Sequence, residues 1–270
     1  MADQTQTKPV ILSIAGVDPS GGAGVVADIK TIAAFECFPA AVITSITFQN
    51  TVGVFGAVHQ TAETVRGQIE PIVSDFHVAA VKTGMLATAE IIIEVARAFR
   101  ETHLPSPVVD PVMRATSGDE LIEAEALDTL KSELFPLARL VTPNIPEAQR
   151  LAGFSIRNVD DMRKAALKIK LLGAPAVLVK GGHARRQEQE AGAIAQAIDV
   201  LLDDRGELTE FRAEYVDGGD VHGSGCTLSA AIAACLGKGM SLLDAVGEAK
   251  SYVTQRIRLA QPIGRGARPM

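Results

Sequence analysis

The sequence DVHGSGCT at residues 220–227 runs directly into LSAAIAACL at residues 228–236, a segment of strong helix formers. The first turn of a helix has backbone N–H groups without intrahelical partners and carries a partial positive charge. The glycines on either side of Ser224 let the backbone curl close to a ligand, so the stretch predicts a nest for a phosphate or a carboxylate. The thiol of Cys226 stands where a helix N-terminus would stabilise a thiolate. A glycine-rich cap on a buried helix explains the same residues equally well.

Upstream of this stretch, short apolar runs alternate with helical patterns. Strands are predicted over residues 10–15, 40–48, 79–82, 107–110, 139–141 and 176–179, and helices over 25–35, 61–74, 88–101, 123–134, 146–151 and 159–172. Such alternation is typical of an α/β fold with a mostly parallel central sheet and helices on both faces. No linker or internal repeat interrupts it, so we predict a single domain over 1–270, with a flexible polar N-terminus at 1–8.

The last third of the chain departs from this alternation. Residues 197–202 and 208–211 flank a turn at 203–206, which predicts an antiparallel hairpin. The helix that follows Gly225 and a second helix over 242–259 come next, and the tail at 263–269 is predicted to be a loop.

Composition excludes several classes of function. The net charge of −6 without a basic cluster, and the absence of Trp, argue against a nucleic-acid surface. No apolar run approaches the ~20 residues that span a bilayer, so no membrane contact is expected. Cys37, Cys226 and Cys235 form no disulfide pattern, which favours a reducing, cytoplasmic location.

Ligands of open α/β sheets bind beyond the carboxyl ends of the strands, so the residues at those ends are the candidates for a site. Polar and glycine residues recur there: Gly16 and Asp18, Gln49 and Asn50, Thr83–Met85, Asp110, Asn144, and Lys180–Gly182. A purely structural account needs polar loops but not this particular collection.

Individual motifs leave alternatives open. Residues 22–27 (GAGVVA) match a loose dinucleotide pattern, but no carboxylate ends the second strand, and there is no P-loop. Asn144 and Glu147 either hold a hydrated Mg²⁺ or form a capping box. Asp28 is either a solvated charge or a ligand-directed carboxylate, and Lys180 either meets phosphate oxygens or caps the sheet.

Five motifs in this order are more specific than any one of them. They are GVDPSGGAG at 16–24, DPVM at 110–113, TPNIPE at 142–147, KGGH at 180–183 and HGSGCTLS at 222–229. Together they resemble the hydroxymethylpyrimidine/phosphomethylpyrimidine kinases of the ribokinase-like superfamily, over residue 10 to the C-terminus. The resemblance implies an enzyme that uses ATP and Mg²⁺ to phosphorylate 4-amino-5-hydroxymethyl-2-methylpyrimidine and then its monophosphate. The product would be the diphosphate for thiamine biosynthesis. A monovalent cation and a homodimer are also typical of such enzymes.

The resemblance also implies roles for single residues. Gly223, Ser224, Gly225 and Cys226 would form an anion hole for the transferring phosphoryl group, and Cys226 would act as the base for the substrate hydroxyl or only position it. The remaining roles are as follows: Asn144, Glu147 and Asp110 near Mg²⁺, largely through water; Lys180, with Asp110 and Asn144, on phosphates; Asp28 and Gln49 reading the aminopyrimidine; and Gly16, Met85 and Val112 lining the pocket.

The sequence departs from the family pattern at three places. Family members often carry Lys at the position of Thr116, and here the basic residue is Arg114, two residues earlier. The segment after His183 is long, and Arg268 replaces the last glycine of the tail. A pyridoxal or pyridoxine kinase of the same superfamily is the nearest rival hypothesis. A non-catalytic pyrimidine or vitamer sensor and a dinucleotide oxidoreductase are the others.

Overall fold

The computed structural model describes residues 8–115, 118, 120–182, 195–216 and 221–270. The predicted flexible N-terminus at 1–8 falls almost wholly outside these residues. The strands are β1 (Val10–Val17), β2 (Phe38–Gln49), β3 (Val54–His59), β4 (Val78–Thr83), β5 (Val108–Val109), β6 (Leu140–Val141), β7 (Val177–Val179), β8 (Gln196–Leu202), β9 (Leu208–Glu214), β10 (Val221–His222) and β11 (Arg268–Pro269). The helices are α1 (Gly24–Ala34), α2 (Ala62–Asp75), α3 (Ala89–Glu101), α4 (Ala124–Thr129), η1 (Leu130–Leu134), η2 (Phe135–Leu137), α5 (Ile145–Ala152), α6 (Val159–Lys170), α7 (Ser224–Gly237) and α8 (Leu242–Leu259).

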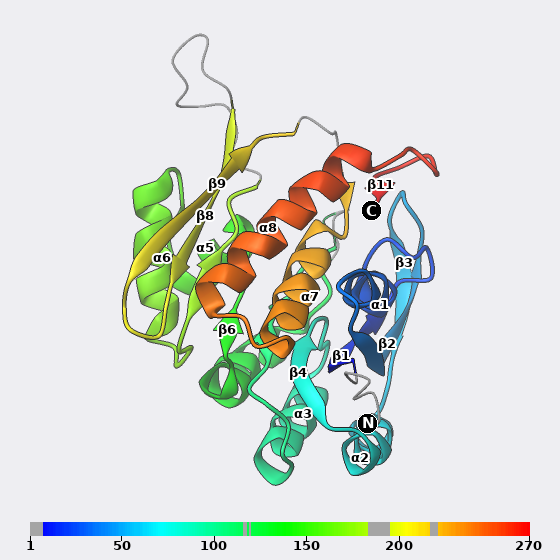
Figure 1. Ribbon diagram of the computed structural model, residues 1–270. Helices are drawn as coiled ribbons and strands as arrows, with labels where there is room; N and C mark the ends of the chain where they lie inside the picture. The colour runs from blue at the N-terminus through cyan, green and yellow to red at the C-terminus, as the bar shows by residue number, and fades with distance from the viewer. Residues whose placement is uncertain (1–7, 116–117, 119, 183–194, 217–220) are drawn as a thin grey trace, which may run out of the picture.

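Nine of these strands form one sheet in the order β3-β2-β1-β4-β5-β6-β7-β8-β9. The pairs from β2 to β7 are parallel, and β3, β8 and β9 add antiparallel edges. Figure 1 shows α1, α7 and α8 in front of the sheet, with α2 and α3 below and α5 and α6 beside β8. The predicted α/β architecture, with a mostly parallel sheet, is confirmed.

The core explains why helices cover both faces of the sheet. Successive residues of β1 point to opposite faces, so Ile11 packs with α7 and α8 while Leu12 packs with the side chains of α2 and α3. The strand is buried on both faces and therefore has a continuous apolar run. Ser13, the polar residue within that run, is also fully buried, and it faces a charged partner at the site.

Neighbouring strand ends are tied together by backbone hydrogen bonds. The N–H of Asp110 donates to the carbonyl of Thr83, the N–H of Thr142 donates to Val109, and the N–H of Lys180 donates to Pro143. These bonds fix the carboxyl ends of β4, β5, β6 and β7 at one edge. The residues predicted at the ends of these four strands therefore lie along one edge of the sheet.

Three local predictions were incomplete or wrong. The sequence did not predict β3, which pairs antiparallel with β2 and carries a glycine at position 56. The helix predicted over 123–134 changes into a π-helical turn from Leu130. The tail was predicted to be a loop, but Arg268 and Pro269 pair in parallel with Val221 and His222. Across the described ranges, none of the helices is both long and apolar enough to cross a membrane.

Candidate active site

The N-terminus of α7 closely approaches two other segments, and at one of them only glycine fits. Gly223 is the N-cap residue with φ 86°, and a Cβ there would lie 1.8 Å from the carbonyl oxygen of Gly22. A Cβ on Gly225 would lie 3.1 Å from Nζ of Lys180. The glycines therefore allow the start of α7 to pack against the β1–α1 loop and against a cationic side chain. This contact is more than a cap requires.

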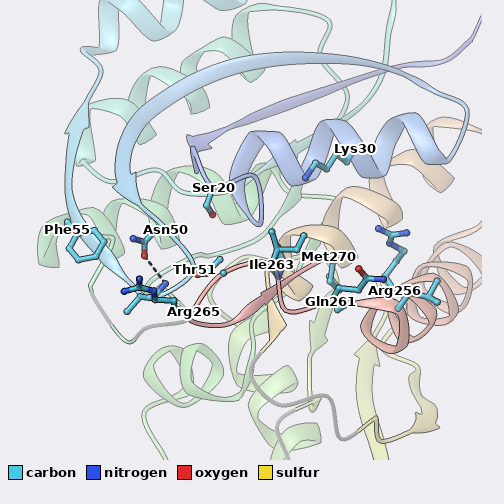
Figure 2. A pocket seen from close by; sticks show the side chains of 15 residues that line it. Ser20, Lys30, Asn50, Thr51, Phe55, Arg256, Gln261, Ile263, Arg265 and Met270 are labelled. Atoms are coloured by element: carbon cyan, nitrogen blue, oxygen red, sulfur yellow. Dashed lines mark hydrogen bonds between the residues drawn. The ribbon is translucent and has the colours of Figure 1, made fainter.

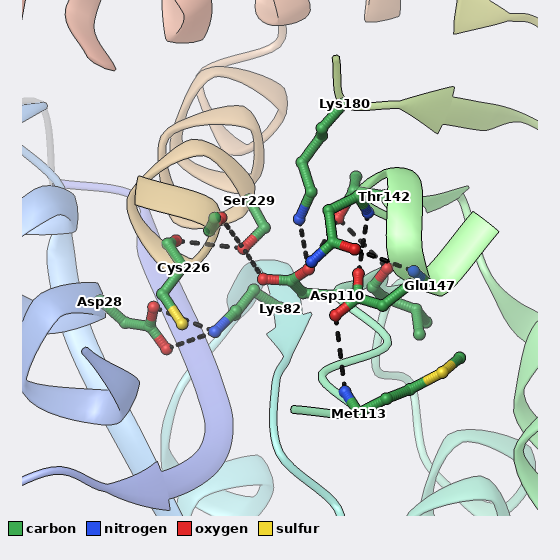
Figure 3. Close-up of polar contacts among 12 residues, drawn as sticks. Asp28, Lys82, Asp110, Met113, Thr142, Glu147, Lys180, Cys226 and Ser229 are labelled. Atoms are coloured by element: carbon green, nitrogen blue, oxygen red, sulfur yellow. Dashed lines mark hydrogen bonds and ion pairs between the residues drawn. The ribbon is translucent and has the colours of Figure 1, made fainter. Parts of the chain in front are cut away.

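Asp110 lies at the centre of a polar cluster below that helix (Figure 3). Its carboxylate accepts hydrogen bonds from Lys180 Nζ at 2.8 Å, from Ser229 Oγ at 3.2 Å and from Thr142 Oγ1 at 3.3 Å. Burial raises the pKa of Asp110, but the ammonium groups of Lys180 and Lys82 outweigh it and hold that pKa below its ordinary value. Asp110 is therefore a buried carboxylate kept in its charged form.

Asn144 and Glu147 form the capping box at the start of α5. The Asn144 side chain accepts the N–H of Glu147 at 2.9 Å, and the Glu147 carboxylate accepts the N–H of Asn144 at 2.8 Å. The cap interpretation is thus confirmed, and the magnesium role stays a prediction. Burial raises the pKa of Glu147 to about 7, with Lys180 opposing the rise and Asp110 adding to it. The cap holds a carboxylate that binds a proton near neutrality.

Cys226 is partly accessible in the first turn of α7, as predicted, but its ionisation differs from the prediction. The helix N-terminus was expected to favour the thiolate. Instead, burial raises the pKa of Cys226 to about 11, although Lys82 and the backbone N–H of Gly24 favour the charged sulfur. The desolvation of the thiol therefore outweighs the helix terminus, and the ligand-free protein holds a protonated thiol at neutral pH.

Asp28 was predicted to read the substrate, with solvation as the alternative, and the structure shows a third arrangement. The residue has no exposed surface. Its carboxylate accepts Ser13 Oγ at 2.6 Å and Lys82 Nζ at 2.8 and 3.0 Å. Solvation is excluded, and direct contact with a ligand would require Asp28 to share its oxygens with these two donors. The long Lys82 and the short Ser13 fill the space around it.

Gln49 lies in a chain of polar contacts that links three segments. Its side-chain amide is 2.9 Å from Nε2 of His222, and the same nitrogen is 2.8 Å from Oδ2 of Asp18. Asp18 also accepts the N–H of Ser20 at 2.8 Å and the N–H of Ala23 at 2.9 Å. The predicted substrate reader is therefore held by the loop that precedes α7 and by the β1–α1 loop.

The three predicted lining residues occupy two positions. Gly16 and Met85 are neighbours, because a Cβ on Gly16 would lie 3.1 Å from the sulfur of Met85. Val112 follows β5 and is partly exposed. Its backbone N–H donates to the carbonyl oxygen of Asp110 at 2.8 Å. The structure thus brings Gly16 and Met85 together and places Val112 with the Asp110 cluster.

Sequence reasoning missed the residues that complete the network, Ser13, Lys82, Thr142 and Ser229. Lys82 left a visible signal, since a lysine near the end of an apolar strand is unusual in a buried parallel sheet. The other three are small hydroxyl residues. Thr142 and Ser229 fall within the motifs at 142–147 and 222–229, but neither motif indicates a contact with Asp110, and Ser13 lies inside an apolar run that gives no signal.

The three departures from the family pattern have different outcomes. Arg114 is an exposed residue that pairs with Glu120 at 2.6 Å, away from Asp110 and Lys180. Arg268 takes part in the strand pairing of the tail. The segment that follows His183 lies outside the described residues.

A cavity of about 850 Å³ lies beside this cluster rather than within it (Figure 2). Ser20 of the β1–α1 loop, Asn50 and Thr51 after β2, and residues 259–265 of the tail line most of it. The tail thus encloses a space next to the loop that Asp18 anchors. Of the strand-end candidates, Asn50 lines this cavity, whereas Asp110, Lys180 and Gln49 do not.

The donors present fit a magnesium ion that is shared with a phosphate. Within the described part of the chain, no group of three or more His, Cys, Asp or Glu side chains could hold a metal alone. Asp110 and Glu147 supply two buried carboxylates that both interact with Lys180. Mg²⁺ is usually bound by one or two carboxylates, water and substrate phosphates, so this pair suits it better than a complete protein cage would.

Comparison with known proteins agrees with this geometry. The family model described as phosphomethylpyrimidine kinase matches residues 18–270. The chain belongs to this family. A hydroxymethylpyrimidine/phosphomethylpyrimidine kinase of Mycobacterium tuberculosis is 42% identical over 271 residues, which cover 100% of this chain and 96% of that protein. A thiamine biosynthesis bifunctional protein of Geobacter sulfurreducens is 43% identical over 96% of this chain, and the match spans 51% of its own length.

Two solved structures place this phosphomethylpyrimidine kinase family member among vitamin kinases. The phosphomethylpyrimidine kinase of Clostridium difficile is 39% identical with a TM-score of 0.79, covering 93% of this chain and 100% of that one. An ADP complex of Bacillus subtilis pyridoxal kinase is 35% identical with a TM-score of 0.86, covering 97% and 96%. The shared fold is therefore compatible with either substrate ring.

Proposed function

We propose that this chain is the kinase that phosphorylates 4-amino-5-hydroxymethyl-2-methylpyrimidine and then its monophosphate, with ATP as the phosphoryl donor. The observation that carries the proposal is the arrangement at the start of α7, where glycines let the first turn of the helix pack against the β1–α1 loop, Lys180 and Asp110. Family membership and about 42% identity to kinases of this name support the choice of substrate.

The α7 terminus and Lys180 would bind the charge of the transferring phosphoryl group. Phosphoryl transfer depends on positioning and on electrostatic stabilisation, and the α7 terminus and Lys180 would supply both. Asp110, Glu147 and, through the cap, Asn144 would hold Mg²⁺ through water. When bound, Mg²⁺ would neutralise charge on the phosphate oxygens. A monovalent cation beside the site is a further part of this proposal.

Cys226 would lie against the hydroxymethyl oxygen of the substrate. Its thiol is protonated at neutral pH in the ligand-free protein, so in that state it positions the hydroxyl rather than removing its proton. A base role requires that the surrounding charges lower the pKa of Cys226 when substrates bind. Gln49 would pair with the edge of the aminopyrimidine. Asp28 would do so as well if one of its carboxylate oxygens is released by Lys82. Gly16, Met85 and Val112 would line the ring.

The test compares two substrates with the purified protein, ATP and Mg²⁺. We expect the hydroxymethylpyrimidine to be turned over at a higher kcat/KM than pyridoxal. The pyridoxal alternative has a specific observation in its favour, since solved pyridoxal kinases match with TM-scores of 0.86 and 0.87. Faster turnover of pyridoxal would establish that alternative. Binding of either substrate without formation of ADP from ATP would establish a sensor.

We also propose that the protein works as a homodimer in the cytoplasm, without a nucleic-acid or membrane partner. All three cysteines are free thiols, as a reducing compartment requires. The outer face of β2 and β3 exposes Ile46, Phe48 and Val58, a grouping that supports a protein contact there.

A further inference from the structure

Lys82 is one of the largest side chains that are completely buried among the described residues, and the reaction scheme above gives it no task of its own. Its ammonium group donates to both carboxylate oxygens of Asp28, at 3.0 and 2.8 Å. Burial would lower the pKa of Lys82, but the Asp28 carboxylate outweighs that effect and raises the pKa above its ordinary value. A permanent positive charge therefore lies inside the protein, where an unpaired charge is very costly.

The neighbouring residues keep this charge where it is. A Cβ on Gly84 would lie 2.7 Å from Nζ of Lys82, so the glycine after Thr83 leaves the space that the ammonium group occupies. Figure 3 shows Lys82 and Asp28 pointing toward each other, with the sulfur of Cys226 directed to the same point from α7. The ion pair is close enough for Lys82 and Asp28 each to interact electrostatically with the thiol.

Four charged groups face Cys226, each from a different element. Lys82 comes from β4 and favours the thiolate, whereas Asp28 from α1 and Asp110 after β5 disfavour it. Lys180 after β7 also interacts with the sulfur, but its ammonium group is bound to Asp110 at 2.8 Å. Lys82 is therefore the main positive charge at the thiol, and Asp28 competes for it.

We propose that Lys82 is a positioning residue for Cys226: its ammonium group is the counter-charge of the thiolate, and Asp28 limits how much of that charge the sulfur receives. The consequence for catalysis rests on the proposed kinase function. The charge relation itself can be measured without any substrate, so a failure of one is distinguishable from a failure of the other.

The experiment measures alkylation of Cys226 by iodoacetamide between about pH 8 and pH 10, followed at the Cys226 peptide by mass spectrometry. In this reaction the proton leaves the sulfur, an S–C bond forms and iodide departs, so the rate reports the thiolate fraction. Asp28→Asn removes the competing charge and should speed alkylation roughly tenfold. Adding Lys82→Met to that variant should slow it again by roughly tenfold.

The opposite directions of these two effects separate a charge relation from loss of structure, which would expose the thiol and speed alkylation in both variants. The double variant also avoids leaving Asp28 as an unpaired buried carboxylate, so it keeps the test valid if Lys82→Met alone fails to fold. Lys250→Met is the matched control, because it breaks a buried ion pair with Asp199 at 2.7 Å elsewhere. The proposal would be overturned if all variants had the same alkylation rate, or if adding Lys82→Met raised the rate further instead of lowering it. It would also be overturned if Lys250→Met changed the rate by as much as Asp28→Asn does.

Discussion

Glu147 shows how one residue serves both the fold and the site. As the third residue of α5 it completes a capping box, which stabilises the helix in either protonation state of the side chain. As a buried carboxylate next to Asp110 it is in an environment that disfavours its charge, and burial raises its pKa to about 7. The chain therefore keeps at this position an acid that a bound cation would stabilise, at a cost to the ligand-free protein.

This cost predicts a pH dependence of stability. The pKa of Glu147 is raised in the folded state from 4.5 to about 7, so its contribution is fully present below pH 4.5 and is lost as the pH rises through 7. The loss amounts to about 3 kcal/mol. Glu147→Gln keeps the cap acceptor and removes the ionisation. In urea unfolding with a chelator, we expect the variant to gain on the wild type between pH 5 and pH 8.

Activity should change in the opposite direction, because the variant should need more Mg²⁺ for turnover. Glu125→Gln, at an exposed position of α4, serves as the control for both measurements. The expected ionisation would be contradicted if the difference in unfolding free energy between the wild type and Glu147→Gln were the same at pH 5 and at pH 8.

At the scale of elements, the tail is the least expected feature. Arg268 and Pro269 form β11 and pair with β10, immediately before the N-cap of α7. The tail is also held at Thr51, whose carbonyl accepts the N–H of Ala267 at 2.8 Å. A Cβ on Gly22 would lie 3.2 Å from Pro269, so the tail packs against the β1–α1 loop as well. The end of the chain thus supports the two loops that shape the site.

Removing residues 268–270 should therefore impair catalysis more than folding. Loss of the β10–β11 pairing frees the backbone before Gly223, and a small misplacement of the α7 terminus should lower kcat roughly 10- to 100-fold. The unfolding midpoint should change little, since the lost backbone hydrogen bonds contribute about 1 kcal/mol each. Ile263→Ala, in the same tail but exposed and outside the pairing, is the control. An unchanged kcat in the truncated protein would show that the tail does not support the site.

Elements whose buried residues form a regular apolar pattern could be predicted from the sequence, and elements without such a pattern could not. The strands from 10–15 to 176–179 and the helix at 242–259 were predictable because their apolar periodicity reports burial directly. The edge strand β3 was not, because Gly56 interrupts its short apolar run VFGAV and all of its residues are partly or fully exposed. The two-residue pairing of β11 depends on contacts 47 positions away in the chain, which no local pattern encodes. At the site, motifs identified Cys226, but its raised pKa depends on packing that only the fold defines.

At the scale of the whole molecule, the sheet leaves one apolar surface uncovered. β2 and β3 form an edge of the sheet, and their paired residues Ile46 and Val58 are 46% and 51% exposed. Phe48, 52% exposed, lies next to them over Gly56, where a Cβ would meet its ring at 2.9 Å. Exposed apolar groups of this kind, on neighbouring strands, are typical of a protein–protein contact surface. In the proposed homodimer, the same face of a second copy covers it.

The dimer proposal predicts that a charge on this surface separates the subunits. Phe48→Glu would bury an unpaired carboxylate at each copy of the contact, and a two-fold contact doubles that penalty. We expect the wild type to sediment as a dimer and the variant as a monomer in analytical ultracentrifugation at micromolar concentration. Leu171→Glu is the matched control, because Leu171 is 82% exposed after α6, at the other end of the sheet. A monomeric wild type would refute the homodimer, and a variant that stays dimeric would place the contact on another surface.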